Sequence, residues 1–74
     1  MQNRTLQQRV GDVIRRRRKR LGYSQEAFAD CIHMHRAYYG ALERGEKNLQ
    51  LSTLERVSAG LRVPLWEVIR DAGP

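Results

Sequence analysis

The chain lacks the features that stabilise or anchor a protein by means other than a hydrophobic core. Its 74 residues include a single cysteine, Cys31, which excludes an internal disulfide framework. No segment approaches the about 18 consecutive apolar residues of a membrane span, and the first residues lack the apolar run of a secretory signal. We therefore expect one domain over residues 1–74, in a reducing, cytoplasmic setting without membrane contact. Because a core of this size is small, we expect dimerisation to add stability.

Groups suited to catalysis are also scarce. The sequence shows no nucleophile beside a base, no paired carboxylates in an apolar segment and no glycine-rich phosphate loop. We therefore expect neither an enzyme nor a cofactor. Cys31, His33 and His35 form a Cys-x-His-x-His cluster, but a structural zinc site needs a fourth ligand and the chain has no other cysteine or histidine. We expect no metal, and we expect Cys31 to pack in the core.

Acidic residues are rare in the first part of the chain. Residues 1–20 hold eight basic side chains against Asp12 alone, a balance of +7, whereas the other 54 residues hold six basic and seven acidic groups, a balance of −1. This asymmetry indicates a polyanionic partner, either nucleic acid or an acidic membrane surface. Most of the basic residues lie in the run 15–20. Six successive residues go around a helix, so the run cannot form one binding stripe, and we expect most of it to be solvated.

The apolar residues recur at helical spacing, and no segment has the pattern of a strand. The expected helices cover about residues 5–21, 25–32, 36–44, 51–61 and a last segment from Pro64 onward. Gly22 is placed to end the first helix, and Ser24 to cap the second. The fourth helix has two candidate caps, Ser52 and Gln50. The sequence therefore predicts an all-α domain of five short helices.

Local spacing also predicts which side chains face the core. In the second helix the expected buried residues are Ala27, Phe28, Cys31 and Ile32. In the fourth they are Leu51, Leu54, Val57 and Leu61. Arg17 falls on the apolar stripe of the first helix, so its head group should extend into solvent.

Residues 24–45 have the pattern of a helix-turn-helix, in which the second helix enters the major groove of DNA. The residues expected on the exposed face of that helix are polar or small: His35, Arg36, Ala37, Gly40 and Ala41. Small side chains permit close approach to base edges, and an arginine can bridge O6 and N7 of guanine. We therefore expect Arg36 to be the main base reader, in a helix that Gly40 weakens by about 1 kcal/mol relative to alanine.

The segments SQEAFAD and ALERGEKN resemble the Cro and phage-repressor type of helix-turn-helix family, also called XRE-like, and the likeness runs without a gap from about Leu6 to Ile69. His35-Arg36-x-Tyr38 is also similar to the recognition helix of restriction–modification controller proteins. The resemblance implies a lambda-repressor-like fold with a recognition helix at about 36–44. One departure is His33, which stands where the family usually has glycine in a left-handed turn.

The resemblance also implies roles for individual residues. Arg18 and Glu43 align with a buried structural ion pair, and Tyr39 should point into the core. The residues implied to face bases are His35, Arg36, Ala37, Tyr38 and Ala41, with Tyr38 reaching either a base edge or a phosphate. The residues implied to contact phosphates are Gln25, Lys47 and Asn48.

Three functional hypotheses follow. The first is a homodimeric transcriptional regulator of a palindromic operator, such as a restriction–modification controller or phage repressor, with double-stranded DNA and the transcription machinery as partners. The second is an antitoxin that also binds a toxin, and the third is a protein-interaction module that no longer binds DNA. Arg36 on the reading face argues against the third. Leu65 and Trp66 fit either the core or a dimer interface, which would also include Ile69.

Overall fold

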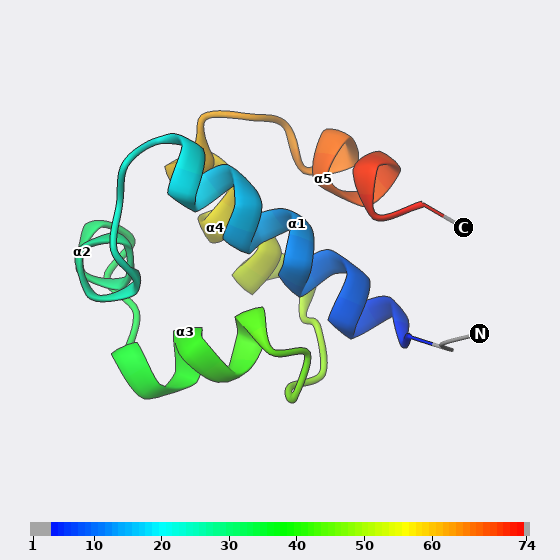
Figure 1. Cartoon of the computed structure of the whole chain (residues 1–74), viewed down its shortest axis with the longest axis horizontal. Coiled ribbons are helices and arrows are strands. Elements are labelled where there is room, and N and C mark those ends of the chain that lie inside the picture. Colours follow the sequence, from blue (N-terminus) through cyan, green and yellow to red (C-terminus); the bar gives the residue numbers. More distant parts are fainter. Residues whose placement is uncertain (1–3, 74) are drawn as a thin grey trace.

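The computed structural model describes residues 4–73, and this part of the chain consists of five α-helices joined by short loops (Figure 1). Their bounds are α1 Leu6–Arg20, α2 Gln25–Cys31, α3 Arg36–Glu43, α4 Leu51–Leu61 and α5 Leu65–Ala72. The prediction of an all-α chain with five helices is therefore confirmed for these residues. Each helix ends within about two residues of its expected position, since the signals that start and stop helices are local.

The helix ends show why these segments are helical. Thr5 caps α1 in a capping box: its hydroxyl accepts the backbone N–H of Gln8, whose side chain in turn accepts the backbone N–H of Thr5. Ser24 caps α2 by accepting the N–H of Ala27. Gln50, one of the two candidates, is the N-cap residue of α4.

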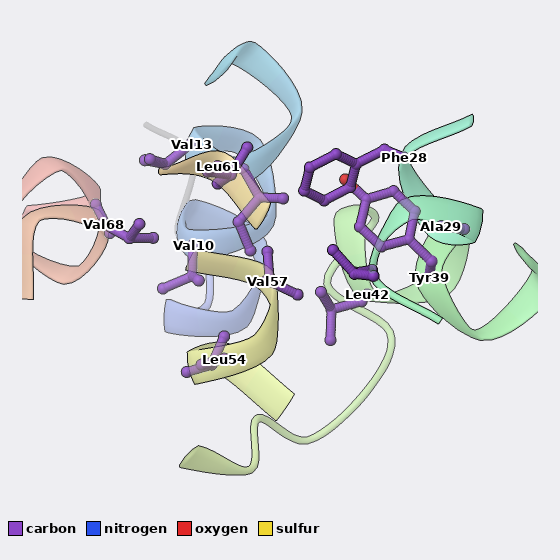
Figure 2. Close-up of a cluster of buried hydrophobic side chains, with 13 residues drawn as sticks. Val10, Val13, Phe28, Ala29, Tyr39, Leu42, Leu54, Val57, Leu61 and Val68 are labelled. Carbon is purple, nitrogen blue, oxygen red and sulfur yellow. The ribbon is translucent and has the colours of Figure 1, made fainter. Parts of the chain in front are cut away.

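The core lies where α1 and α4 meet the pair α2 and α3, and α5 covers it from the other side (Figures 1 and 2). Figure 2 shows Phe28 and Tyr39 side by side in this core, with Val68 of α5 at its opposite end. The aromatic rings of Phe28 and Tyr39 are 5.3 Å apart between centroids and both are fully buried. This contact fixes α2 against α3. The prediction that Tyr39 points into the core is confirmed.

The expected buried face of α2 was wrong in two positions. Cys31 is exposed, as is Ala27, whereas Ala29 is buried at 1% exposure. A helix of seven residues makes barely two turns, so several faces fit its apolar pattern, and the contacts with α3 decide between them. In α4, Leu51 is also an exception, because it is 73% exposed at the first position of its helix.

A close approach between α1 and α3 depends on Gly11. A Cβ added at this position would lie 2.4 Å from the carbonyl oxygen of Glu43, a distance that real contacts do not reach. The backbones of the two helices therefore meet where a side chain is absent. This approach brings the C-terminal end of α3 close to α1, and it places Glu43 within reach of Arg18.

Candidate nucleic-acid interface

The turn between α2 and α3 has the conformation expected of a helix-turn-helix. His33 lies in the left-handed region with a φ of 56°, as its place in the usual glycine position implies. The backbone N–H of Met34 donates to the carbonyl of Ala29 at 2.8 Å and closes the turn. This geometry sets the angle at which α3 leaves α2 and so aims the exposed edge of α3.

The N-terminal end of α3 presents a solvent-facing edge. His35, Arg36 and Ala37 are exposed, while Tyr39 and Leu42 on the opposite side are fully buried. The three residues expected to face bases at this end are therefore accessible together. The guanidinium of Arg36 is not free, because its Nη1 lies 2.8 Å from Oε1 of Glu26 at the start of α2. Both side chains are mostly exposed, so this pair is screened by solvent.

Farther along α3 the expectation fails for Ala41. This residue was expected to face bases, but it is only 6% exposed, and Gly40 is buried as well. The C-terminal half of α3 packs against α1, so that all residues from Tyr39 to Glu43 are buried, whatever side of the helix they occupy. Ala41 is therefore not part of the exposed edge.

Arg44 was missed by the sequence analysis. Its Nη1 would lie 3.2 Å from a Cβ added at Gly40, so the guanidinium covers that glycine at the C-terminal end of the exposed edge. Its Nε and Nη2 both donate to the carboxylate of Glu46. The signal was available in the sequence, since positions 36, 40 and 44 share one helical face.

Gln25 has a defined position at the beginning of α2. Its Nε2 donates to Oε1 of Glu43 at 2.9 Å, and its Oε1 would lie 3.5 Å from a Cβ at Gly40. The side chain is thus tied to α3 and lies close to the face that carries Arg44. A phosphate contact from Gln25 would be made by a side chain already held in place.

The loop that follows α3 carries the other expected phosphate contacts. Lys47 and Asn48 are both exposed between α3 and α4. The Lys47 Nζ lies 5.9 Å from the ring centroid of Tyr38, which is half-buried against the core. This cation–π contact links the loop to the side of α3 and orients the ammonium group.

The ion pair between Arg18 and Glu43 is confirmed. Arg18 Nε and Nη2 donate to the two carboxylate oxygens at 2.7 and 3.1 Å, and the side chains are only 6% and 1% exposed. Tyr39 and Gln25 also donate to this carboxylate. Burial by itself would raise the pKa of Glu43, but the hydrogen bonds from Arg18, Tyr39 and Gln25 outweigh it and lower the pKa. The pair ties α1 to the end of the reading helix.

A second exposed surface lies on α5. Trp66 is 62% and Ile69 40% exposed, whereas Leu65 is half-buried against the core. Trp66 is covered on one side by the guanidinium of Arg70, 5.2 Å from its ring centroid. These three apolar side chains are the ones expected at a dimer interface.

The prediction for Arg17 was wrong. Its head group does not extend freely into solvent, because it forms ion pairs with Glu67, at 2.9 Å, and with Asp71. Both carboxylates belong to α5, which covers this side of α1.

Over residues 4–73, no helix is long and apolar enough to cross a membrane. In the same residues, no three His, Cys, Asp or Glu side chains are grouped in a way that could hold a metal ion.

Comparisons with known proteins match this geometry. The helix-turn-helix family model HTH_3 covers residues 14–67. The control protein C.MunI of a Mycoplasma species is 41% identical over 64 residues, which are 85% of this chain and 86% of that protein.

Solved structures extend the likeness to the whole described fold. The restriction–modification controller protein C.Esp1396I, solved as a tetramer in complex with its natural 35 base-pair operator, has a TM-score of 0.81 and 30% identity; the match covers 95% of this chain and 97% of that one. The clp gene regulator ClgR from C. glutamicum has a TM-score of 0.90 at 24% identity, covering 96% and 91%, and supports the fold alone.

C.MunI is a control protein and C.Esp1396I a controller protein, which agrees with the expectation that the chain is not an enzyme. The chain therefore belongs to the XRE-like helix-turn-helix family of DNA-binding regulators, has its five-helix lambda-repressor-like fold, and is similar to restriction–modification controller proteins.

Proposed function

We propose that the protein is a homodimeric transcriptional regulator that binds a palindromic operator and controls a restriction–modification system. The observation that carries this proposal is the exposed edge of α3, where Arg36 and Ala37 are accessible beside a rigid turn. The likeness to C.Esp1396I, whose structure includes its operator, supports the same reading. A regulator of this kind works where the genome lies, so we assign it to the cytoplasm, with the transcription machinery as a further partner.

In the proposed complex, α3 enters the major groove with its N-terminal end toward the bases. Arg36 donates to O6 and N7 of a guanine after exchanging its contact with Glu26. Ala37 contacts a thymine methyl group, and His35 and Tyr38 reach neighbouring base edges or phosphates. Because only a few long side chains lie on this edge, part of the specificity comes from the deformability of the DNA.

The contacts that set the register come from outside the edge of α3. Gln25 is held beside Gly40, and Lys47 and Asn48 extend from the loop after α3. These three residues flank the exposed edge on two sides, where they would meet phosphates rather than bases. Their polar groups can donate hydrogen bonds to phosphate oxygens. Arg18 and Glu43 contribute by holding α3 against α1.

The proposed dimer forms through α5. Trp66 is exposed on the same helix as Ile69 and Leu65. Burial of these apolar side chains in a dimer would stabilise a small domain. A twofold axis there would place two copies of α3 on successive major grooves, about 34 Å apart per helical turn. The operator would then be palindromic.

The proposal is tested by selecting duplexes from a random pool and measuring affinity for the selected and a scrambled duplex. We expect a symmetric site, and we expect Arg36→Ala to lose about 1–3 kcal/mol on it while affecting one base pair most strongly. Lys47→Ala should weaken both duplexes alike and lower the salt slope by about one. A pool that yields no preferred sequence would contradict the proposed function. An equal loss on both duplexes for Arg36→Ala would make Arg36 a phosphate contact.

A further inference from the structure

The structure assigns different partners to the members of the basic run 15–20. Arg16 Nε lies 3.1 Å from a carboxylate oxygen of Asp12, Arg17 is paired with two carboxylates of α5, and Arg18 is buried against Glu43. Three charges of the run are therefore used inside the domain. Arg15 is exposed and makes no ion pair within residues 4–73.

Arg15 lies at a groove between α1 and α3. The groove has a volume of about 690 Å³, and its lining includes Arg4, Asp12, Arg15, Gln25, Glu43 and Arg44. In Figure 1 the first half of α1 runs beside the C-terminal end of α3. The groove is lined mainly by residues of α1 and of the end of α3, and Gln25 of α2 also lines it. Two of its lining residues, Gln25 and Arg44, also cover Gly40, which lies one helical turn after the exposed Arg36. The groove is thus continuous with the DNA-binding edge.

The charge of the groove favours an anion. Its carboxylates are already neutralised, Asp12 by Arg16 and Glu43 by Arg18. Among residues 4–73, Arg44 is paired only with Glu46, and both of these side chains are 57% exposed, so a stronger anion can replace this partner at little cost. Arg15 and Arg44 thus offer two guanidinium groups from opposite walls. Two such groups suit a phosphate, which accepts several charge-assisted hydrogen bonds at once.

We propose that this groove binds a backbone phosphate of the DNA, with Arg15 and Arg44 as its ligands, so that α1 contributes to the interface beside α3. The inference rests on the proposed function. It commits to duplex DNA because the groove shares Gln25 and Arg44 with the reading face, whereas a small anionic effector would need no such continuity. The remaining exposed members of the basic run do not line this groove.

The test compares Arg15→Ala with the matched control Arg20→Ala. Arg20 is an exposed arginine of the same helix, about 140° around its axis, and it lines a separate hollow beside Asp71. Both variants remove one positive charge, so they have the same effect on the net charge. Neither side chain supports the core, and thermal unfolding followed by circular dichroism should give wild-type values for both.

Affinities for the selected and the scrambled duplex are measured by fluorescence anisotropy between 50 and 200 mM salt. We expect Arg15→Ala to weaken binding to both duplexes by the same factor. The slope of log affinity against log salt concentration should be smaller by about 0.9, so that the loss of affinity between 50 and 200 mM salt is about 3.5-fold smaller than in the wild type. Arg20→Ala should keep the wild-type slope.

Two results would overturn the inference. One is a wild-type slope for Arg15→Ala, and the other is an equal loss of slope in the two variants, which would indicate a net-charge effect only. Failure of the proposed function is seen separately, because the wild-type protein would then bind both duplexes with equal affinity. If the groove binds a small anion instead of DNA, Arg15→Ala would bind DNA like the wild type, and inorganic phosphate would bind to the wild-type protein but not to the variant.

Discussion

The guanidinium of Arg36 and the carboxylate of Glu26 are 2.8 Å apart and join the first turns of α2 and α3. With exposed fractions of 65% and 69%, the two side chains are accessible to solvent and to DNA. The residue proposed to read guanine is therefore held beside a negative charge in the free protein. That charge repels phosphates, while the ion pair itself is screened by solvent and costs Arg36 little to leave.

Glu26→Gln should raise affinity for scrambled DNA and reduce the ratio of operator to scrambled binding. The neutral side chain no longer repels phosphates, and Arg36 becomes free to contact the backbone. The salt slope on scrambled DNA should steepen by up to about one unit. The control is Glu55→Gln, the same charge change at an exposed residue of α4. If both variants change the ratio equally, Glu26 acts only through the net charge.

Glu43→Gln should lower the free energy of unfolding by about 3–5 kcal/mol at neutral pH, because the buried Arg18 loses its counter-charge. The pKa of Glu43 is lower in the folded protein than its ordinary value of 4.5. The ionised carboxylate therefore makes its full contribution to the free energy of unfolding at pH values above 4.5. It is lost as the pH falls through the folded pKa. The difference between wild type and variant should therefore shrink on acidification below pH 4.5, as measured by urea unfolding.

Tyr39→Phe is the control for this experiment. It removes one hydrogen bond to the same carboxylate but keeps the ion pair, so it should cost about 1–2 kcal/mol. Because it is the milder change, Tyr39→Phe can still be measured if Glu43→Gln does not fold. A difference between wild type and Glu43→Gln that stays constant with pH would contradict the lowered pKa.

Gly40→Ala should stabilise the fold and weaken DNA binding. Replacing a glycine inside a helix gains up to about 1 kcal/mol, and the new Cβ meets only the mobile end of Arg44 at 3.2 Å and Gln25 at 3.5 Å. The guanidinium of Arg44 would have to shift away from its place beside Gly40 on the DNA-facing surface, whereas Gln25 would remain in ordinary contact. Thermal unfolding and anisotropy should therefore change in opposite directions.

Gly11→Ala provides the contrast, because its Cβ would lie 2.4 Å from a backbone oxygen of Glu43 and should destabilise the fold. Unchanged DNA binding in Gly40→Ala would place Arg44 outside the interface.

Trp66→Ala should shift the sedimentation of the protein from dimer toward monomer. Trp66 is 62% exposed, so its loss removes little from the core of one chain, and the unfolding of the monomer should hardly change. Aromatic side chains contribute strongly to the interfaces that they centre. Leu51→Ala is the control, since Leu51 is also exposed but lies at the start of α4. A Trp66→Ala dimer that persists at micromolar concentration would place the interface elsewhere.

The candidate site was predictable where the signals are local. The position of Arg36 at the start of α3 follows from the helix boundary, and the left-handed turn at His33 was implied by the resemblance to the family. Ala41 and Cys31 could not be placed correctly, because the rotation of a helix of seven or eight residues about its axis is set by its neighbours. A weak apolar pattern over two turns leaves that rotation undetermined.

The sequence by itself determined the five helices, the Ser24 cap of α2, and an Arg36 exposed on the second helix of a helix-turn-helix, since each depends on residues a few positions apart. Arg36 thus remains the proposed base reader, now with Glu26 as its partner in the free protein. The resemblance implied the pairing of Arg18 with Glu43, but only the tertiary structure decided what the other arginines of the basic run do. Arg17 meets a carboxylate 54 residues away and Arg18 one 25 residues away, while Arg15 is left at the groove. Contacts over such separations arise from the packing of whole helices, which no local pattern encodes.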